Sequence, residues 1–194
     1  MRGLVLTLWL LPSVALAYPE FQKFSQVTSG RGVNCAMCHA HPDGPDGVKA
    51  GQIGSLDAAA LDRLNQARIA FEPGLSVDSP ILNAFGDEII KTVGKKAVLA
   101  MRADPAALAT AMILTDLDGD GIMDGDEYLD GTHPLDPNHG DPWKLAVVNL
   151  GRHKLDLLLL ALATVLGLYG LGHILRWFGH EADVALGKGS RPKQ

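Results

Sequence analysis

Cys35-Ala36-Met37-Cys38-His39 is the stretch around which the rest of the chain is organised. It reads C-x-x-C-H, the pattern at which haem is attached covalently to a polypeptide. Each thiol adds across one vinyl group of the haem, and the adjacent imidazole is then held close to the iron, whose usual proximal ligand is histidine. The spacing therefore predicts one covalent haem c, bound through Cys35 and Cys38, with His39 on the iron.

Other uses of this stretch fit the chain less well. A structural zinc site needs four ligands, and the chain has no third or fourth cysteine. A thioredoxin-like dithiol belongs beside a βαβ pattern, which is not visible in this sequence. A disulfide between Cys35 and Cys38 would explain neither His39 nor the residues around it. Haem attachment in bacteria takes place after export, so this interpretation requires an exported chain.

Residues 1–17 supply the expected export signal. They combine a positive start at Arg2, a short apolar run and the small-residue ending Ala15-Leu16-Ala17. This order is typical of a cleaved secretory signal peptide. We therefore expect the mature chain to begin at Tyr18 and the haem-binding part to face the periplasm.

A second apolar run lies near the other end of the chain. Leu157–Leu175 is apolar except for Thr164 and His173. As a helix this run is about 28 Å long, close to the hydrocarbon thickness of a bilayer. We therefore expect a single-pass protein of the bacterial cytoplasmic (inner) membrane, with its C-terminal tail in the cytoplasm.

Composition sets broad limits on the fold and its partners. The chain of 194 residues is long enough for one domain with additional segments. Its formal charge of −5 is modest and argues against nucleic acid as a partner. Both cysteines belong to the haem motif, which leaves no disulfide framework. The core is therefore expected to depend on packing, haem and a metal.

The segments between the motifs have helical rather than strand periodicity. Ser55 is a predicted cap for a helix from Leu56 to about Phe71. Ser79-Pro80 is the predicted start of the next helix, which Gly94 ends. Further helices are expected over residues 95–103 and 105–114, so the soluble part is predicted to be mostly α-helical.

Asp116–Glu127 is a second chemical motif, whose spacing matches a twelve-residue calcium-binding loop. So many carboxylates in one short loop repel one another unless a hard divalent cation neutralises them. Gly121 permits the sharp turn that the loop needs, and Asp126 falls at a non-ligand position. A single loop favours one structural calcium over a regulatory pair. The predicted ligands are Asp116, Asp118, Asp120, the backbone carbonyl of Ile122, Asp124 and Glu127.

The stretch from Asp116 to Asn138 resembles the bacterial thrombospondin type 3-like calcium repeats. In those repeats an aspartate-rich loop precedes a Gly-Thr-x-Pro turn, here Gly131-Thr132-His133-Pro134. The repeats usually carry Asp where this chain has His133, and they usually occur in tandem. The roles of the turn, of His133 and of His139 therefore stay open.

Cys35–Pro42 together with Leu82-Asn83-Ala84-Phe85-Gly86 resembles small exported bacterial c-type cytochrome domains. In that family the haem motif is followed by a Pro-Gly loop and later by an Asn-x-Phe-Gly segment. The resemblance implies electron transfer. Together with the helical periodicity, the acidic loop and the C-terminal apolar run, it leads us to expect a mostly α fold: a small helical cytochrome c-like haem domain with a calcium-binding loop and one C-terminal transmembrane helix.

The motifs divide the chain into six expected segments. They are a signal peptide (1–17), a haem-binding helical region (18–105), an EF-hand-like calcium segment (106–140), a juxtamembrane linker (141–155), a transmembrane helix (156–178) and a cytoplasmic tail (179–194).

The sixth ligand of the iron is the least determined feature of the haem site. Met101 and Met112 lie on predicted helices and are the candidates that we favour, and a methionine there would raise the reduction potential. Met37 is expected to point elsewhere, and Met123 belongs to the calcium loop. A five-coordinate iron stays open, as do the histidine alternatives His133, His139 and His153.

We expect an electron carrier rather than an enzyme, since no nucleophile–base constellation or catalytic metal set is evident. The expected partners are a soluble periplasmic electron carrier, a membrane redox complex or b-type cytochrome subunit, and the lipid bilayer. His173 inside the predicted span and His153 beside it are candidates to ligate a haem of such a membrane partner. The alternatives are a calcium-ordered accessory or assembly subunit of a respiratory complex, and a haem-based sensor with an open sixth position.

Overall fold

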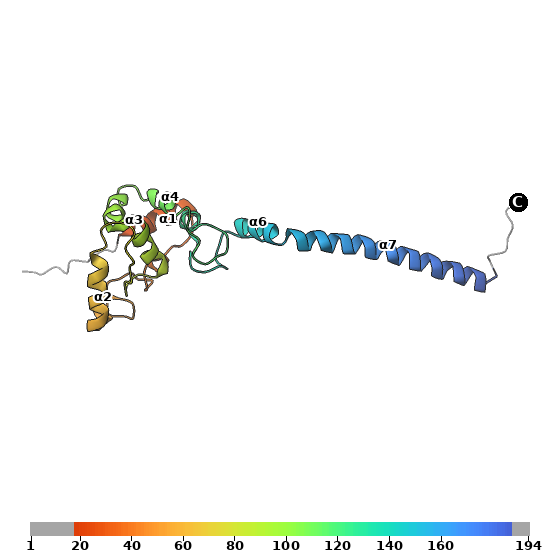
Figure 1. The fold of residues 1–194 in the computed structure, drawn as a ribbon, viewed down its shortest axis with the longest axis horizontal. Helices are drawn as coiled ribbons and strands as arrows, with labels where there is room; N and C mark the ends of the chain where they lie inside the picture. Colours follow the sequence, from red (N-terminus) through yellow and green to blue (C-terminus); the bar gives the residue numbers. More distant parts are fainter. Residues whose placement is uncertain (1–17, 188–194) are drawn as a thin grey trace, which may run out of the picture. The chain divides into compact units, whose positions relative to one another are not determined.

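The computed structural model describes residues 18–187, so the predicted signal peptide and the end of the predicted tail lie outside the described residues. Within the described range the chain is helical and has no strand, which confirms the mostly α prediction (Figure 1). The helices are α1 (Pro19–Ser29), α2 (Ala58–Arg68), α3 (Ala84–Met101), α4 (Ala107–Ala111), α5 (Asp124–Asp130), α6 (Pro142–Arg152) and α7 (Lys154–Ala185).

Contacts divide the chain into two compact units, one ending at Leu145 and the other beginning at Ala146. The first unit contains both the C-x-x-C-H motif and the acidic loop. The segments predicted at 18–105 and 106–140 therefore belong to one folded unit and share one core. That core contains Phe21, Val33, Met37, Phe85, Ile89, Val98, Leu108, Ala109, Met112 and Tyr128.

α5 lies at the centre of the packing in the first unit. It packs against α1 and α4, and α4 in turn packs against α3. Gly125 permits the close approach of α5 to α4, because a Cβ at this position would collide with the backbone carbonyl of Ala109. On the same helix the buried Tyr128 hydroxyl lies 3.2 Å from the carbonyl oxygens of both Phe21 and Pro105, to which it can donate. This short helix thus joins the acidic loop to the core.

The start of α2 differs from the prediction by two residues. Ser55 does not cap this helix, because it ends a short 3-10 turn at Ile53–Ser55. Asp57 is the cap, and its carboxylate accepts a hydrogen bond of 2.8 Å from the backbone N–H of Ala60. The helix also ends earlier than predicted, at Arg68.

α3 begins at Ala84 and not at Pro80 as predicted, because Asn83 caps it through the backbone N–H of Gly86. The predicted break at Gly94 is confirmed: its φ of +78° is left-handed, and the backbone turns helical again after it. The helix predicted over residues 105–114 is confirmed only for the short α4.

The second unit holds the end of α6 and the whole of α7. The predicted linker at 141–155 is largely helical, since α6 covers most of it. α7 contains the predicted span at 156–178 and extends beyond it on both sides, to a length of about 48 Å. Its best window has a mean hydropathy of 2.0, and none of that window is buried. A helix of this length and composition is compatible with a single membrane crossing.

Candidate cofactor and metal sites

The C-x-x-C-H motif opens onto a cavity of about 350 Å³ in the first unit. Cys35, Cys38 and His39 all lie on its wall. The volume is within the range of about 300–1,000 Å³ that small-molecule and cofactor sites occupy. Most of the remaining wall is apolar and comes from α1, α2, α3 and α5, through Phe21, Leu64, Ala67, Ile89, Ile90, Val98 and Tyr128.

The motif itself is a single tight turn. Cys35–Met37 form a 3-10 turn, which begins where the Asn34 side chain accepts a hydrogen bond from the Ala36 N–H. The backbone N–H groups of Cys38 and His39 both donate to the carbonyl of Cys35. This turn brings the two thiols and the imidazole to one cavity wall.

A distant segment, Ile81–Gly86, holds the motif in place. The Nδ1 atom of His39 lies 3.1 Å from the carbonyl oxygen of Ile81, and the N–H of Ala40 donates to the same carbonyl. Because a carbonyl can only accept, this contact assigns the proton to Nδ1 and leaves the Nε2 lone pair for a metal. Burial lowers the pKa of the His39 imidazole, which favours the neutral form that a metal ligand requires.

Asn83 and Gly86 explain the Leu82–Gly86 segment that the sequence singled out. The Asn83 amide donates to the carbonyls of Ala36, at 2.6 Å, and Met37, at 3.1 Å, while its oxygen caps α3. Gly86 lies so close to the carbonyl of Cys38 that a Cβ atom would collide with it. The carbonyl of Ile81 was missed at the sequence level, because a backbone acceptor leaves no residue signature.

Both thiols are free, and neither has the low pKa of a reactive redox pair. Burial, with a smaller effect of Cys35, raises the pKa of Cys38 to about 12. Burial also raises the pKa of Cys35, with an added effect of Asp43. The raised pKa values disfavour a thioredoxin-like dithiol.

The structure does not bring either favoured methionine to the cavity. Met112 is fully buried in the core and Met101 packs against that core, but neither lies on the cavity wall. Met37, which was expected to point elsewhere, is 6% exposed, belongs to the core and is also among the residues that line the cavity. The alternatives His133 and His139 do not line the cavity either, and His153 belongs to the second unit.

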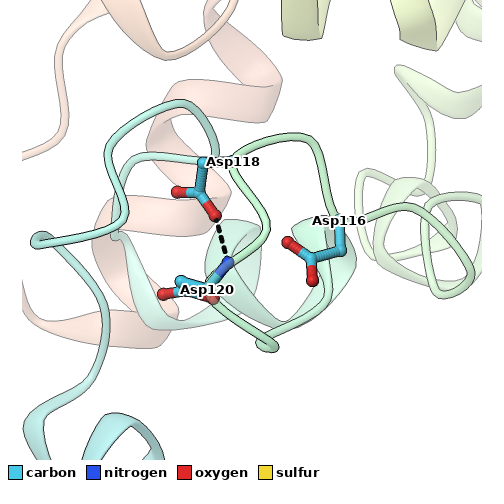
Figure 2. A group of neighbouring side chains, drawn as sticks. All are labelled: Asp116, Asp118 and Asp120. Atoms are coloured by element: carbon cyan, nitrogen blue, oxygen red, sulfur yellow. Dashed lines mark hydrogen bonds between the residues drawn. The ribbon is translucent and has the colours of Figure 1, made fainter.

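The acidic loop brings its first three aspartates together. Ligand atoms of Asp116, Asp118 and Asp120 lie within 4.8 Å of one another, and Figure 2 shows their carboxylates around a common space. The loop's own backbone orients them: Gly119 and Gly121 donate to Asp116, Asp120 donates to Asp118, and Ile122 donates to Asp120. Each bond occupies one lone pair and leaves other oxygen sites for a cation.

Asp124 and Glu127 complete the predicted ligand set from the first turns of α5. Both residues are fully buried, although carboxylates are almost never buried without a partner. Asp118, Asp120, Asp124 and Glu127 each have one buried oxygen without a hydrogen-bond partner. Burial, with the charge of Asp118 nearby, raises the pKa of Glu127 to about 8. A bound divalent cation would compensate these buried oxygens, so the residues fit a calcium ion.

Thr132 gives the turn after the loop a role that the sequence left open. Its hydroxyl donates to the Glu127 carboxylate at 3.1 Å, and its N–H donates to the Glu127 carbonyl. Gly131 ends α5 with a left-handed backbone and so makes this return possible. Asp126, the predicted non-ligand, lies 3.9 Å from the Lys144 ammonium. In the sequence, the Gly131-Thr132 pair was the signal that could have predicted these contacts between Thr132 and Glu127.

Known proteins place no further constraint on these sites. A scan against protein-family models gives no match, and searches of curated proteins and of solved structures also give none. The interpretation of both sites therefore depends on the geometry of this chain.

Proposed function

We propose that this protein is a membrane-anchored monohaem c-type cytochrome that carries electrons and holds one structural calcium ion. Bound haem would supply a one-electron iron couple. The protein itself would attach, orient and shield that group. No step in this function requires the chain to act on a substrate.

The proposal depends on one observation above all: Cys35, Cys38 and His39 all line the same cavity. The two cysteines are the residues that would attach haem through thioethers. His39 would ligate the iron through Nε2, because its Nδ1 is held by the carbonyl of Ile81. The apolar wall would exclude water, and this would lower the solvent reorganisation energy when the charge on the iron changes.

Calcium is the second ligand of the proposal. Four carboxylate oxygens are buried without a partner in the loop, and hard oxygen donors at this spacing suit calcium. Because Tyr128 follows Glu127 on α5 and lines the cavity, the ion would stiffen one wall of the haem site. Its role is structural, since only one such loop is found.

The proposed location is the periplasmic face of a bacterial inner membrane. It is supported by the predicted signal peptide and by the length and hydropathy of α7. The proposed partners are a soluble periplasmic carrier and a membrane redox complex or b-type cytochrome, between which an anchored carrier would pass electrons. The tail after the span would lie in the cytoplasm.

The deciding experiment is a pyridine haemochrome assay on the full chain, produced with a working haem-attachment system and purified in detergent. We expect a c-type spectrum with equal amounts of haem and protein, and haem that stays with the chain after denaturation. Haem that is removed by acid–acetone extraction would disprove covalent attachment, and a chain without any haem would overturn the proposed function.

A further inference from the structure

The wall of the cavity offers the iron one histidine and, in the part of the chain that the structure describes, no second one. Among the residues that the structure describes, His39 is the only histidine on the wall and Met37 the only methionine. Met112 belongs to the core and Met101 packs against it, and neither of these methionines favoured from the sequence lines the cavity. A second axial ligand from this chain would therefore have to be one of a few remaining donors.

Met37 is excluded by its position in the motif. It lies between the two cysteines and two residues before His39, in the tight turn that Asn83 holds through two backbone carbonyls. Thioethers on both sides would keep Met37 on the same side of the haem as His39. Its thioether could not then reach the opposite face of the ring.

Tyr128 and Lys95 are both engaged in other contacts. The Tyr128 hydroxyl already has two backbone partners, because it lies 3.2 Å from the carbonyl oxygens of both Phe21 and Pro105. The Lys95 ammonium donates to the carbonyl of Arg68 and stands 5.4 Å from the centre of the Phe71 ring. A charged ammonium has no lone pair to offer.

Tyr18 is another oxygen donor on the cavity wall. It is 39% exposed, and its ring lies against the Arg102 guanidinium, 4.8 Å away. The deeper wall is formed by the side chains of Phe21, Val33, Ile89, Val98 and Leu108. These apolar groups can neither ligate iron nor stabilise a charged ligand.

We propose that the sixth position of the iron is open to a small neutral molecule of the carbon monoxide, nitric oxide or dioxygen class. The inference depends on the proposed haem attachment and deepens it. A mostly apolar wall favours an uncharged ligand, because an anion would lose much of its hydration on entering it. Binding forms one coordinate bond to ferrous iron, with no electron or proton transferred in the case of carbon monoxide.

The test is a carbon monoxide titration of the full chain in detergent, with its attached haem reduced by dithionite. We expect a stoichiometric shift of the Soret band, and no charge-transfer band of methionine-ligated haem in the oxidised protein. An unchanged ferrous spectrum at saturating carbon monoxide would overturn the inference. The haemochrome assay is read separately, so a lack of haem would be recognised as a failure of the proposed function.

Three variants identify the ligand if the titration fails. Met101→Leu, Met112→Leu and Lys95→Ala each remove one donor, and the leucine changes roughly conserve side-chain volume. Gain of carbon monoxide binding in one variant would name that residue as the sixth ligand and refute the open site. Met123→Leu in the acidic loop is the matched control, and the inference requires all four variants to bind carbon monoxide like the unmodified protein.

Discussion

The C-x-x-C-H turn and the acidic loop are both short, donor-rich stretches in the same folded unit, but they are built differently. The acidic loop orients its first aspartates with its own backbone N–H groups. The C-x-x-C-H turn instead depends on Ile81 and Asn83, more than forty residues away, to fix its imidazole and its carbonyls. A local motif can thus be complete in sequence and still require a distant segment for its geometry.

Loss of both thiols should break the first site completely. In the double variant Cys35→Ala and Cys38→Ala we expect no haem that survives denaturation, because no thioether can form. The acidic loop should be unaffected, so a calcium-dependent rise in melting temperature should persist. The measurements are haem staining of denatured protein and thermal unfolding with calcium or chelator. Covalent haem in this variant would refute the assignment of the motif.

Loss of one carboxylate at the end of the acidic loop should have the next largest effect. An ion at a hundredfold excess over its Kd stabilises the folded state by about 2.7 kcal/mol. Glu127→Gln keeps the volume and an acceptor for Thr132, and we expect most of that calcium-dependent gain to disappear. Differential scanning calorimetry with and without calcium measures it.

Asp126→Asn is the matched control for this change, because Asp126 lies next to Glu127 but at a non-ligand position near Lys144. It should keep the calcium effect. Equal melting temperatures of the unmodified protein in calcium and in chelator would argue that the loop binds no ion.

Asn83→Ala tests how strongly the C-x-x-C-H turn depends on its distant support. The change removes the cap of α3 and two hydrogen bonds to the turn, which together suggest a loss of about 2–3 kcal/mol. Asp57→Ala removes a cap only, from α2, and should cost about 1 kcal/mol. Urea unfolding compares the two, and equal losses would mean that the two bonds to the turn contribute nothing.

The smallest expected effect is the contribution of Asp87 to the pH dependence of the free energy of unfolding. Burial raises its pKa from 3.8 to about 6, against the opposing hydrogen bond from Ser79. The folded state therefore keeps a proton that the unfolded chain has already lost, so stability falls as the pH rises from about 4 to about 6. Asp87→Asn should remove this fall and stabilise the protein at pH 7 by at most about 1 kcal/mol, since the site is only half-buried.

Unfolding at pH 4.5 and at pH 7 measures this difference. Asp62→Asn, at an exposed position on α2, is the matched control and should leave the fall of stability between the two pH values in place. The same pH profile in Asp87→Asn and in the unmodified protein would show that this carboxyl is not the cause.

The sequence predicted the helical class and the break at Gly94, and it predicted that Cys35, Cys38 and His39 lie together, as do Asp116, Asp118 and Asp120, because these features depend on near neighbours. It placed the start of α3 at Pro80 because a proline is a good first residue of a helix. The helix begins after Asn83 instead. The side-chain oxygen of Asn83 caps α3, and its side-chain N–H group donates to the C-x-x-C-H turn. The cavity wall was not predictable, because it combines residues from the five helices α1 to α5, which only tertiary packing brings together.

Glu127 and Tyr128 are neighbours on α5, and the first belongs to the proposed calcium ligands while the second lines the cavity. If calcium changes the affinity of this wall for its ligand by some factor, the ligand must change the affinity for calcium by the same factor. A calcium titration of the ferrous protein, with and without carbon monoxide, would thus measure the coupling free energy between the two sites that α5 connects.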